Sequence, residues 1–264
     1  MSEESAAIGR VFLANSAERL RREGVEVTML VLDTDEMARV APLRHLWRLG
    51  RRQARIGIAG VSTVRQLARI QGYRWLTRRR SCQHAGPSLP EGLPIVRVPT
   101  LNSPTAIHAI IRAGCDLVCL MGARILTRRT LAGIGLPIIN IHSSDPRWVR
   151  GGPVVVWEVL AGRPAITLVV HEVVEAVDAG AILAQGSQRV LYQGGLGATT
   201  EATMAAARPT VADLFERAIR DRLAGLPQRT PFQPGELRVT PALGEALRAE
   251  RLCRVRTARA RELF

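Results

Sequence analysis

One strand-like segment of the sequence ends in side chains that can do acid–base chemistry. The apolar pair Ile138-Ile139 is followed by Asn140, Ile141 and His142. Alternate residues of a strand point to the same face, so Asn140 and His142 should share a face. An amide can donate a hydrogen bond to a developing oxyanion, and an imidazole can move protons near neutral pH. The pattern indicates a catalytic site, although a histidine that only satisfies buried backbone groups fits it equally well.

A second polar cluster can supply a carboxylate to the same place. It runs from His171 to Asp178, directly after the apolar segment 165–170. In parallel α/β sheets the carboxyl ends of the strands open onto the ligand crevice, so we expect the two clusters to meet there. His171 either touches a ligand in that crevice or simply ends its strand.

The elements that must position these residues alternate between strands and helices. The expected strands are 11–14, 26–32, 95–98, 116–121, 137–141, 165–171 and 181–190. The expected helices follow caps at Ser16, Ser103 and Thr127, or cover 154–161 and 211–223. This alternation favours an α/β fold with a mostly parallel sheet and flanking helices. Residues 43–73 should be helical in pieces, 78–92 a loop, and the tail from Leu226 irregular.

Three motifs in this order resemble a known family. The first runs from Asn140 to Pro153 and is followed by Trp157; the second joins Ile166-Thr167 and His171 to the segment 178–185; the third is the upstream segment 121–126. Together they resemble the folate-dependent formyltransferases, which include the glycinamide ribonucleotide, methionyl-tRNA and sugar N-formyltransferases. The resemblance covers about residues 94–190.

The resemblance implies a Rossmann-like formyltransferase fold with Asn140, His142 and Asp178 as the catalytic set. It implies 10-formyltetrahydrofolate, or the 5-formyl form, as the donor, with the pterin held between two segments of the chain. The implied cofactor-binding residues are Arg124, Ile125, Leu126, Val174, Glu175, Val177 and Asp178. The reaction would move the formyl group to a small-molecule amine.

The sequence departs from the family pattern in places that bear on the substrate. Ser144 is followed by Asp145 and Pro146, where the family usually has two leucines before the proline. The expected first strand ends in Ala14, Asn15 and Ser16 without the Gly-rich loop whose free amides cradle a phosphate in the ribonucleotide-binding members. This argues against a purine-pathway substrate and leaves Asn15, Ser16 and His171 as weak candidates for substrate contacts.

From the length of the region after the motifs, we expect no β-barrel like that of the methionyl-tRNA members. We therefore expect a catalytic domain over 1–225 and a C-terminal extension over 226–264 that packs on the domain or trails it. The favoured acceptor is an amino sugar, including nucleotide-linked ones. The alternatives are an amino-acid or natural-product amine and, from another class, a catalytically inactive RNA-binding or regulatory protein on the same fold.

The formal net charge of +14 raises the question of nucleic-acid binding. All 37 basic residues are arginine, and they are scattered along the chain, so a compositional bias explains them better than a phosphate-binding surface. We therefore do not expect nucleic acid as a partner, and an anionic small substrate suits the charge better.

Other features exclude further classes of protein. Cys82, Cys115, Cys119 and Cys253 show no spacing typical of a disulfide framework, and Cys82 with His84 lacks a second pair of ligands, so we expect no metal. No apolar run reaches the roughly 18 residues that span a bilayer, and the acidic N-terminus is unlike a signal peptide. We expect a cytoplasmic protein without membrane contact. The sequence does not decide between a monomer and a homodimer.

Overall fold

The central sheet has four strands. In the computed structural model, which describes residues 6–34, 89, 91–225, 232–238 and 240–261, they lie in the order β3-β4-β6-β7. Their bounds are Val118–Leu120, Ile138–His142, Ala165–Glu172 and Ile182–Arg189. β3 and β4 are parallel, whereas β6 runs antiparallel to both β4 and β7. Because β4 is internal, its carboxyl end lies beside both β3 and β6.

Two further strand pairs, both parallel, complete the described sheets. β1 (Leu30–Asp33) pairs with β2 (Ile95–Val98), and β5 (Val149–Gly151) pairs with β8 (Glu236–Arg238). The parallel pairs and flanking helices agree with the predicted α/β class. The β5–β8 pair joins residues that lie far apart in the sequence.

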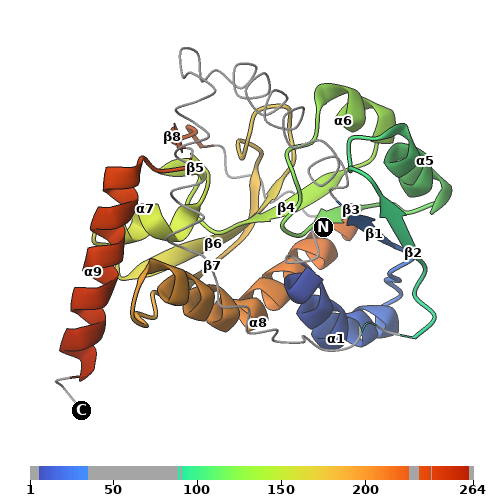
Figure 1. The fold of residues 1–264 in the computed structure, drawn as a ribbon. Helices are drawn as coiled ribbons and strands as arrows, with labels where there is room; N and C mark the ends of the chain where they lie inside the picture. Colours follow the sequence, from blue (N-terminus) through green and yellow to red (C-terminus); the bar gives the residue numbers. More distant parts are fainter. Residues whose placement is uncertain (1–5, 35–88, 90, 226–231, 239, 262–264) are drawn as a thin grey trace.

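The helices form groups around the strands (Figure 1). α1 (Ala6–Arg22) lies along α8 (Leu196–Leu223), and α8 also packs on β6 and β7. α5 (Pro104–Arg112) and α6 (Arg128–Ile134) lie together near β2, and α7 (Val154–Leu160) packs against α9 (Leu243–Arg261). In the described part of the chain, no helix combines the length and apolarity needed to cross a membrane.

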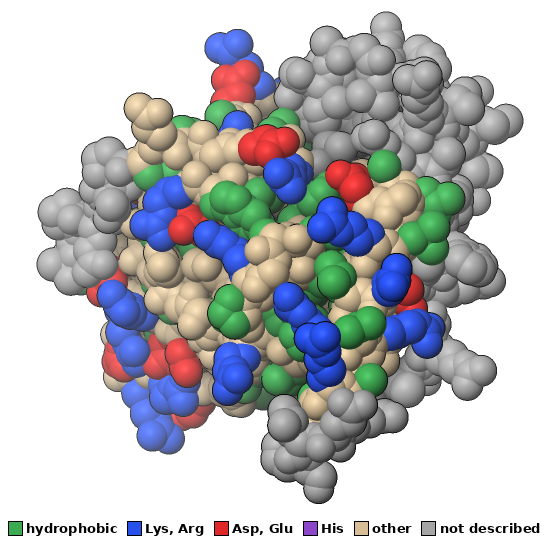
Figure 2. Space-filling view, turned by 90° about the vertical axis from the view of Figure 1, so that its left-hand side faces the viewer, with side chains coloured by type: hydrophobic (Ala, Val, Ile, Leu, Met, Phe, Trp, Pro, Cys, Tyr) green, Lys and Arg blue, Asp and Glu red, His purple; other side chains and the backbone are tan. Residues whose placement is uncertain are grey.

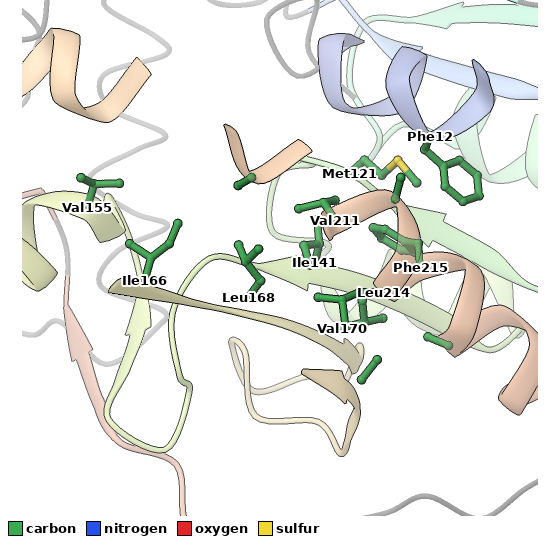
Figure 3. Close-up of a cluster of buried hydrophobic side chains, with 14 of the residues drawn as sticks. Phe12, Met121, Ile141, Val155, Ile166, Leu168, Val170, Val211, Leu214 and Phe215 are labelled. Carbon is green, nitrogen blue, oxygen red and sulfur yellow. The ribbon is translucent and has the colours of Figure 1, made fainter. Parts of the chain in front are cut away.

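The core lies between the central sheet and α8 (Figure 3). Ile166, Leu168 and Val170 alternate along β6 and are each completely buried. Phe215 of α8 is equally buried, and the centroid of its ring lies 5.9 Å from that of Phe12. Fully burying each such aliphatic side chain contributes about 1.5–3 kcal/mol, so this face of β6 is fixed toward α8 and the other face is left for the site.

The predicted first strand is wrong. Residues 11–14 lie inside α1, and Asn15 and Ser16 lie in the same helix rather than at a strand end, so the predicted helix cap at Ser16 is also wrong. Gly9, Phe12, Leu13, Ser16 and Leu20 are its buried residues, a spacing that follows the helical period. A short apolar run fits either period, and the packing of this face against α8 selects the helix.

The tail is also more regular than expected. After residue 231 the chain forms β8 and the 19-residue helix α9. The buried face of α9 carries Ala246, Ala249, Cys253 and Thr257, and it packs on α7 and α8. These side chains are small, which is why the hydrophobic pattern was weak. Figure 2 shows arginine side chains scattered over this side of the molecule among apolar and acidic ones.

Most of the other predicted elements are confirmed. Ser103 and Thr127 cap α5 and α6, because each hydroxyl accepts a hydrogen bond from a main-chain N–H of the first turn. The strand expected over 26–32 begins only at Leu30, and the last helix begins fifteen residues earlier than expected, at Leu196. The predicted helical pieces at 43–73 and nearly all of the predicted loop at 78–92 lie outside the described residues.

Candidate functional site

β4 carries two of the predicted site residues on one face. Ile139 and Ile141 belong to the buried core, so the intervening Asn140 and the following His142 point to the opposite face. The strand is apolar up to Asn140 because its other residues pack against the helices. The alternation predicted from the sequence is therefore the one that the fold uses.

Asp178 reaches this face from the loop between β6 and β7. Its Oδ2 lies 3.5 Å from Nδ1 of His142, and its Oδ1 lies 3.5 Å from Nε2 of His171. The structure thus brings Asp178 and His142 together, and their catalytic roles stay predictions. The carboxylate thus sits between two imidazoles, each of which is largely buried.

His171 is placed more centrally than a weak substrate contact would be. It lies directly opposite Asn140 in the β4–β6 pairing, and only 2% of it is exposed. Its Nδ1 lies 2.7 Å from the carbonyl oxygen of Glu172, to which it can donate. Nε2 is then free to accept from Nδ2 of Asn140, 3.3 Å away. His171 therefore orients the Asn140 amide, and the second amide N–H stays available to a ligand.

The electrostatics of the site favour an ionised carboxylate beside a neutral imidazole. Burial lowers the pKa of His142 below 6.5, against the opposing effect of the Asp178 charge. Burial alone would raise the pKa of Asp178, but the close approach of the His171 and His142 imidazoles and the hydrogen bond from the N–H of Gly151 together lower it. At neutral pH His142 can therefore accept a proton. Its Nε2 is buried and has no hydrogen-bond partner among the described residues.

The backbone around Asp178 is held in an uncommon conformation. Its φ of 48° lies in the left-handed region, which costs a residue with a side chain about 1–2 kcal/mol. The main-chain N–H of Gly151 donates to Oδ2 of Asp178 at 2.9 Å. Nearby, a Cβ on Gly180 would lie only 1.9 Å from the carbonyl oxygen of Glu172, so that close approach requires glycine. Strain held in place by such contacts is a feature of functional sites.

A cavity opens beside these residues. One wall is the segment 123–126, the other is formed by residues of the 173–178 loop, and Asn140 and His171 line it as well. Ile125 and Val174 on opposite walls are 38% and 43% exposed. Apolar side chains around a few convergent polar groups are typical of a small-molecule site. All seven residues predicted to bind the cofactor line this cavity.

Asn102, which none of the sequence motifs includes, holds one wall of the cavity. Its Nδ2 donates to the carbonyl oxygen of Ile125 at 3.1 Å. Its Oδ1 accepts from the N–H of Thr127 and from the hydroxyl of Thr130, both at 2.8 Å. Asp33 supports the same wall, 3.2 Å from Nε of Arg124. The only local signal was the neighbouring helix cap at Ser103.

Two predicted substrate contacts are not brought to this cavity. Asn15 and Ser16 lie within α1, and neither lines it. The Ser16 hydroxyl instead lies 3.5 Å from Nη2 of Arg19, which is ion-paired with Glu216 of α8. A larger cavity of about 370 Å³ lies between β1 and β3, but its lining is mainly apolar and includes none of the predicted catalytic residues. No metal-binding cluster occurs within the described residues, and Cys82 and His84 lie outside them.

Comparison with known proteins gives one family. The family model described as "Formyl transferase" matches residues 71–210, which is more than half of the chain. No curated protein matches the chain significantly.

Several solved structures are similar to the chain. Glycinamide ribonucleotide transformylase 1 from Symbiobacterium toebii is 20% identical with a TM-score of 0.51, over 84% of each chain. A sugar N-formyltransferase from a Shewanella species is 18% identical with a TM-score of 0.42, over 55% of this chain and 56% of that one. A HypX variant from Aquifex aeolicus is 16% identical with a TM-score of 0.46, and this chain spans only 26% of its length. At identities this low, the similarity supports a shared fold and nothing about the substrate.

Proposed function

The chain belongs to the formyltransferase family, and we propose that it moves a formyl group from formyl-tetrahydrofolate to the amino group of a small metabolite. The observation that carries this proposal is the cluster of Asn140, His142 and Asp178, in which the buried His142 lies beside Asp178 and the other two line a partly apolar cavity. The cluster combines a hydrogen-bond donor, a proton acceptor and a carboxylate, which are the groups that acyl transfer to an amine requires.

Each residue has a role in this reaction. As the amine nitrogen attacks the formyl carbon, negative charge develops on the formyl oxygen, and the free N–H of the Asn140 amide can stabilise it. His142, neutral at pH 7, can take the proton that the amine must lose. The bond between the formyl carbon and the folate nitrogen then breaks, and that nitrogen gains a proton.

Asp178 and His171 hold the two reacting groups in place. The Asp178 carboxylate stabilises the protonated form of His142 as it arises, and it can pass protons to the departing nitrogen through water. His171 fixes the amide of Asn140 through its Nε2. Removing one donor to a developing oxyanion typically slows a reaction about 100-fold to 1000-fold.

The donor is proposed to bind in the cavity, with its pterin between the two walls. Arg124, Ile125 and Leu126 would receive one side, and the loop residues Val174, Glu175, Val177 and Asp178 the other. The exposed apolar side chains of Ile125 and Val174 suit a flat ring, and the polar residues at the inner end suit its reactive group. Either the 10-formyl or the 5-formyl donor is compatible with this arrangement.

For the acceptor we favour an amino sugar, including nucleotide-linked ones, because an anionic diphosphate suits the net charge of +14. An amino-acid or natural-product amine is the alternative. An inactive RNA-binding or regulatory protein is disfavoured by the complete catalytic cluster. The division into a catalytic domain over 1–225 and an extension over 226–264, the cytoplasmic location and a homodimer stay predictions.

The test is a direct assay of formyl transfer. The protein is incubated with 10-formyl- or 5-formyl-tetrahydrofolate and a panel of free amino sugars, nucleotide-linked amino sugars and simple amines. Mass spectrometry should find a product in which a formyl group replaces a hydrogen, and the variant Asp178→Asn should form it far more slowly. A panel without product, together with no stabilisation of the protein by a folate analogue, would contradict the proposal.

A further inference from the structure

The C-terminal segment is joined to the chain that follows the catalytic strand. β8 pairs with β5 along residues 236–238, and the pairing is extended on its N-terminal side. The N–H of Gly235 donates to the carbonyl oxygen of Pro146 at 2.8 Å, and the N–H of Glu236 donates to that of Trp148 at 3.1 Å. The register of β5 is thus fixed by a segment 85 residues away.

Arg150, in the middle of β5, connects this segment to the loop that carries Asp178. Its Nε donates to the carbonyl oxygen of Gly235 and its Nη1 to that of Val177, both at 2.9 Å. The next residue, Gly151, donates to the Asp178 side chain at the same distance. Two consecutive residues of β5 therefore bind both the main chain and the carboxylate of the loop.

We propose that Arg150 is a positioning residue for Asp178, and that β8 holds Arg150 in the required place. This inference rests on the proposed function, because it concerns the residue that orients His142. The C-terminal segment then helps to position the active site through Arg150, although β8 itself lies outside the cavity that we assign to the folate.

The chemistry of the contacts explains why this residue is an arginine. A guanidinium presents several N–H donors in a rigid planar fork, so it can bind two carbonyl oxygens in different directions at once. A lysine ammonium is a single point on a flexible stem and would hold one of them less firmly. The left-handed backbone of Asp178 needs such a constraint, since an unconstrained loop would relax to a more common conformation.

Gly235 offers a way to disturb the contact without touching the site. A Cβ on Gly235 would lie 2.3 Å from the carbonyl oxygen of Trp148 and 2.6 Å from that of Arg147. Both are main-chain atoms, so Gly235→Ala must push β8 away from β5 and move the carbonyl that Arg150 binds. Gly244, at the start of α9, has nothing within 4 Å of its added Cβ. Gly244→Ala is therefore a matched control in the same segment.

The experiment compares the wild type with Gly235→Ala, Gly244→Ala and Arg150→Lys. Formyl transfer is measured by kcat and KM, folding by thermal melting, and the pKa of His142 by NMR titration. Gly235→Ala and Arg150→Lys should lower kcat by about tenfold or more, since small displacements of catalytic groups are costly. They should also shift the titration of His142 to lower pH, because the Asp178 charge that opposes the effect of burial has moved away. His171, which also faces His142, is followed in the same spectra. Gly244→Ala should match the wild type.

The possible outcomes are distinct. A titration of His142 that stays unchanged in Gly235→Ala and Arg150→Lys, with kcat also unchanged, would overturn the inference, even if the melting temperature falls. If Gly235→Ala does not fold, Arg150→Lys decides alone. If the wild type transfers no formyl group to any acceptor but the variants still shift the titration, the proposed function fails while the positioning by Arg150 is supported.

Discussion

The main-chain N–H of Gly151 donates a 2.9 Å hydrogen bond to the carboxylate of Asp178. This bond links a three-residue strand to the loop between β6 and β7, and the same carboxylate lies between His142 and His171. The position of Asp178 is therefore set from three directions, and its charge can act on two imidazoles.

The catalytic cluster can be tested by removing its members one at a time. Asn140→Ala, His142→Ala and Asp178→Asn should each lower kcat by about 100-fold or more, because the lost interactions stabilise the transition state. The KM for the formyl-folate should change much less. Turnover and thermal melting are measured on the same preparations. Near-normal turnover in a variant that stays folded would contradict the assigned role of that residue.

The acid side of the pH–rate profile should report the protonation of His142. Burial lowers its pKa below 6.5, so kcat/KM should hold as the pH falls to 6.5 and decline only below that value. Asp178→Asn removes the charge that raises the pKa of His142. In this variant, the remaining kcat/KM should therefore begin to decline only at a still lower pH. The profile of kcat/KM from pH 4.5 to 8 checks both statements. A limb above pH 6.5 would mean that another group controls the rate.

Asn102 should matter for folate affinity rather than for the chemical step. Asn102→Ala removes three hydrogen bonds that hold the cavity wall at Ile125 and Thr127. We expect the KM for the formyl-folate to rise about tenfold, equivalent to about 1.4 kcal/mol. Asn102→Asp keeps both acceptor contacts but sets a carboxylate oxygen against the carbonyl oxygen of Ile125, so a rise in KM there would report on that contact alone. Equal KM values for wild type and Asn102→Ala would show that the wall does not depend on this side chain.

Glu158 should make stability depend on pH. This fully buried side chain accepts from Ser144 at 3.3 Å, and burial raises its pKa to about 7, against the opposing charge of Arg163. The folded state thus keeps a proton that the unfolded chain releases near pH 4.5. The stabilisation that follows is complete below that pH and is lost as the pH rises to about 7.

Glu158→Gln removes this titration. Relative to the wild type, its free energy of unfolding should increase between pH 4.5 and 7.5, by up to about 3 kcal/mol. Urea unfolding of both proteins at three pH values measures this difference. The contribution of His142 to the pH dependence is the same in both proteins and cancels in the difference. A difference that is constant with pH would show that Glu158 does not titrate in this range.

Much of the site was readable from the sequence because its signals are local. Ile138 to His142 combine an uninterrupted apolar run with a polar end, which a buried strand opening onto a crevice produces directly. The role of Asn102 was not readable, because it depends on a loop 23 residues away that only the tertiary fold brings near. The link between Arg150 and Gly235 spans 85 residues and is invisible for the same reason.

The two errors in the secondary structure also have physical causes. Residues 11–14 are apolar in a row, and a run of this length is compatible with a strand or with one side of a helix. In α9 the buried positions are filled by alanine, cysteine and threonine, so the apolar stripe is narrow even though alanine, leucine and arginine favour helix formation. In both cases packing against α8 decides the outcome.

The direct opposition of Asn140 and His171 limits which changes in length the protein can tolerate. Neighbouring residues of a strand face opposite sides, and the adjacent pair, Ile141 and Val170, belongs to the core. Deleting or inserting one residue within β6 would turn His171 into the core and an apolar side chain toward Asn140. The strand could still form, but the site would be lost. Insertions and deletions compatible with activity should therefore be confined to loops that carry no site residue, such as the turn at 161–164 before β6, and libraries of length variants should show this boundary.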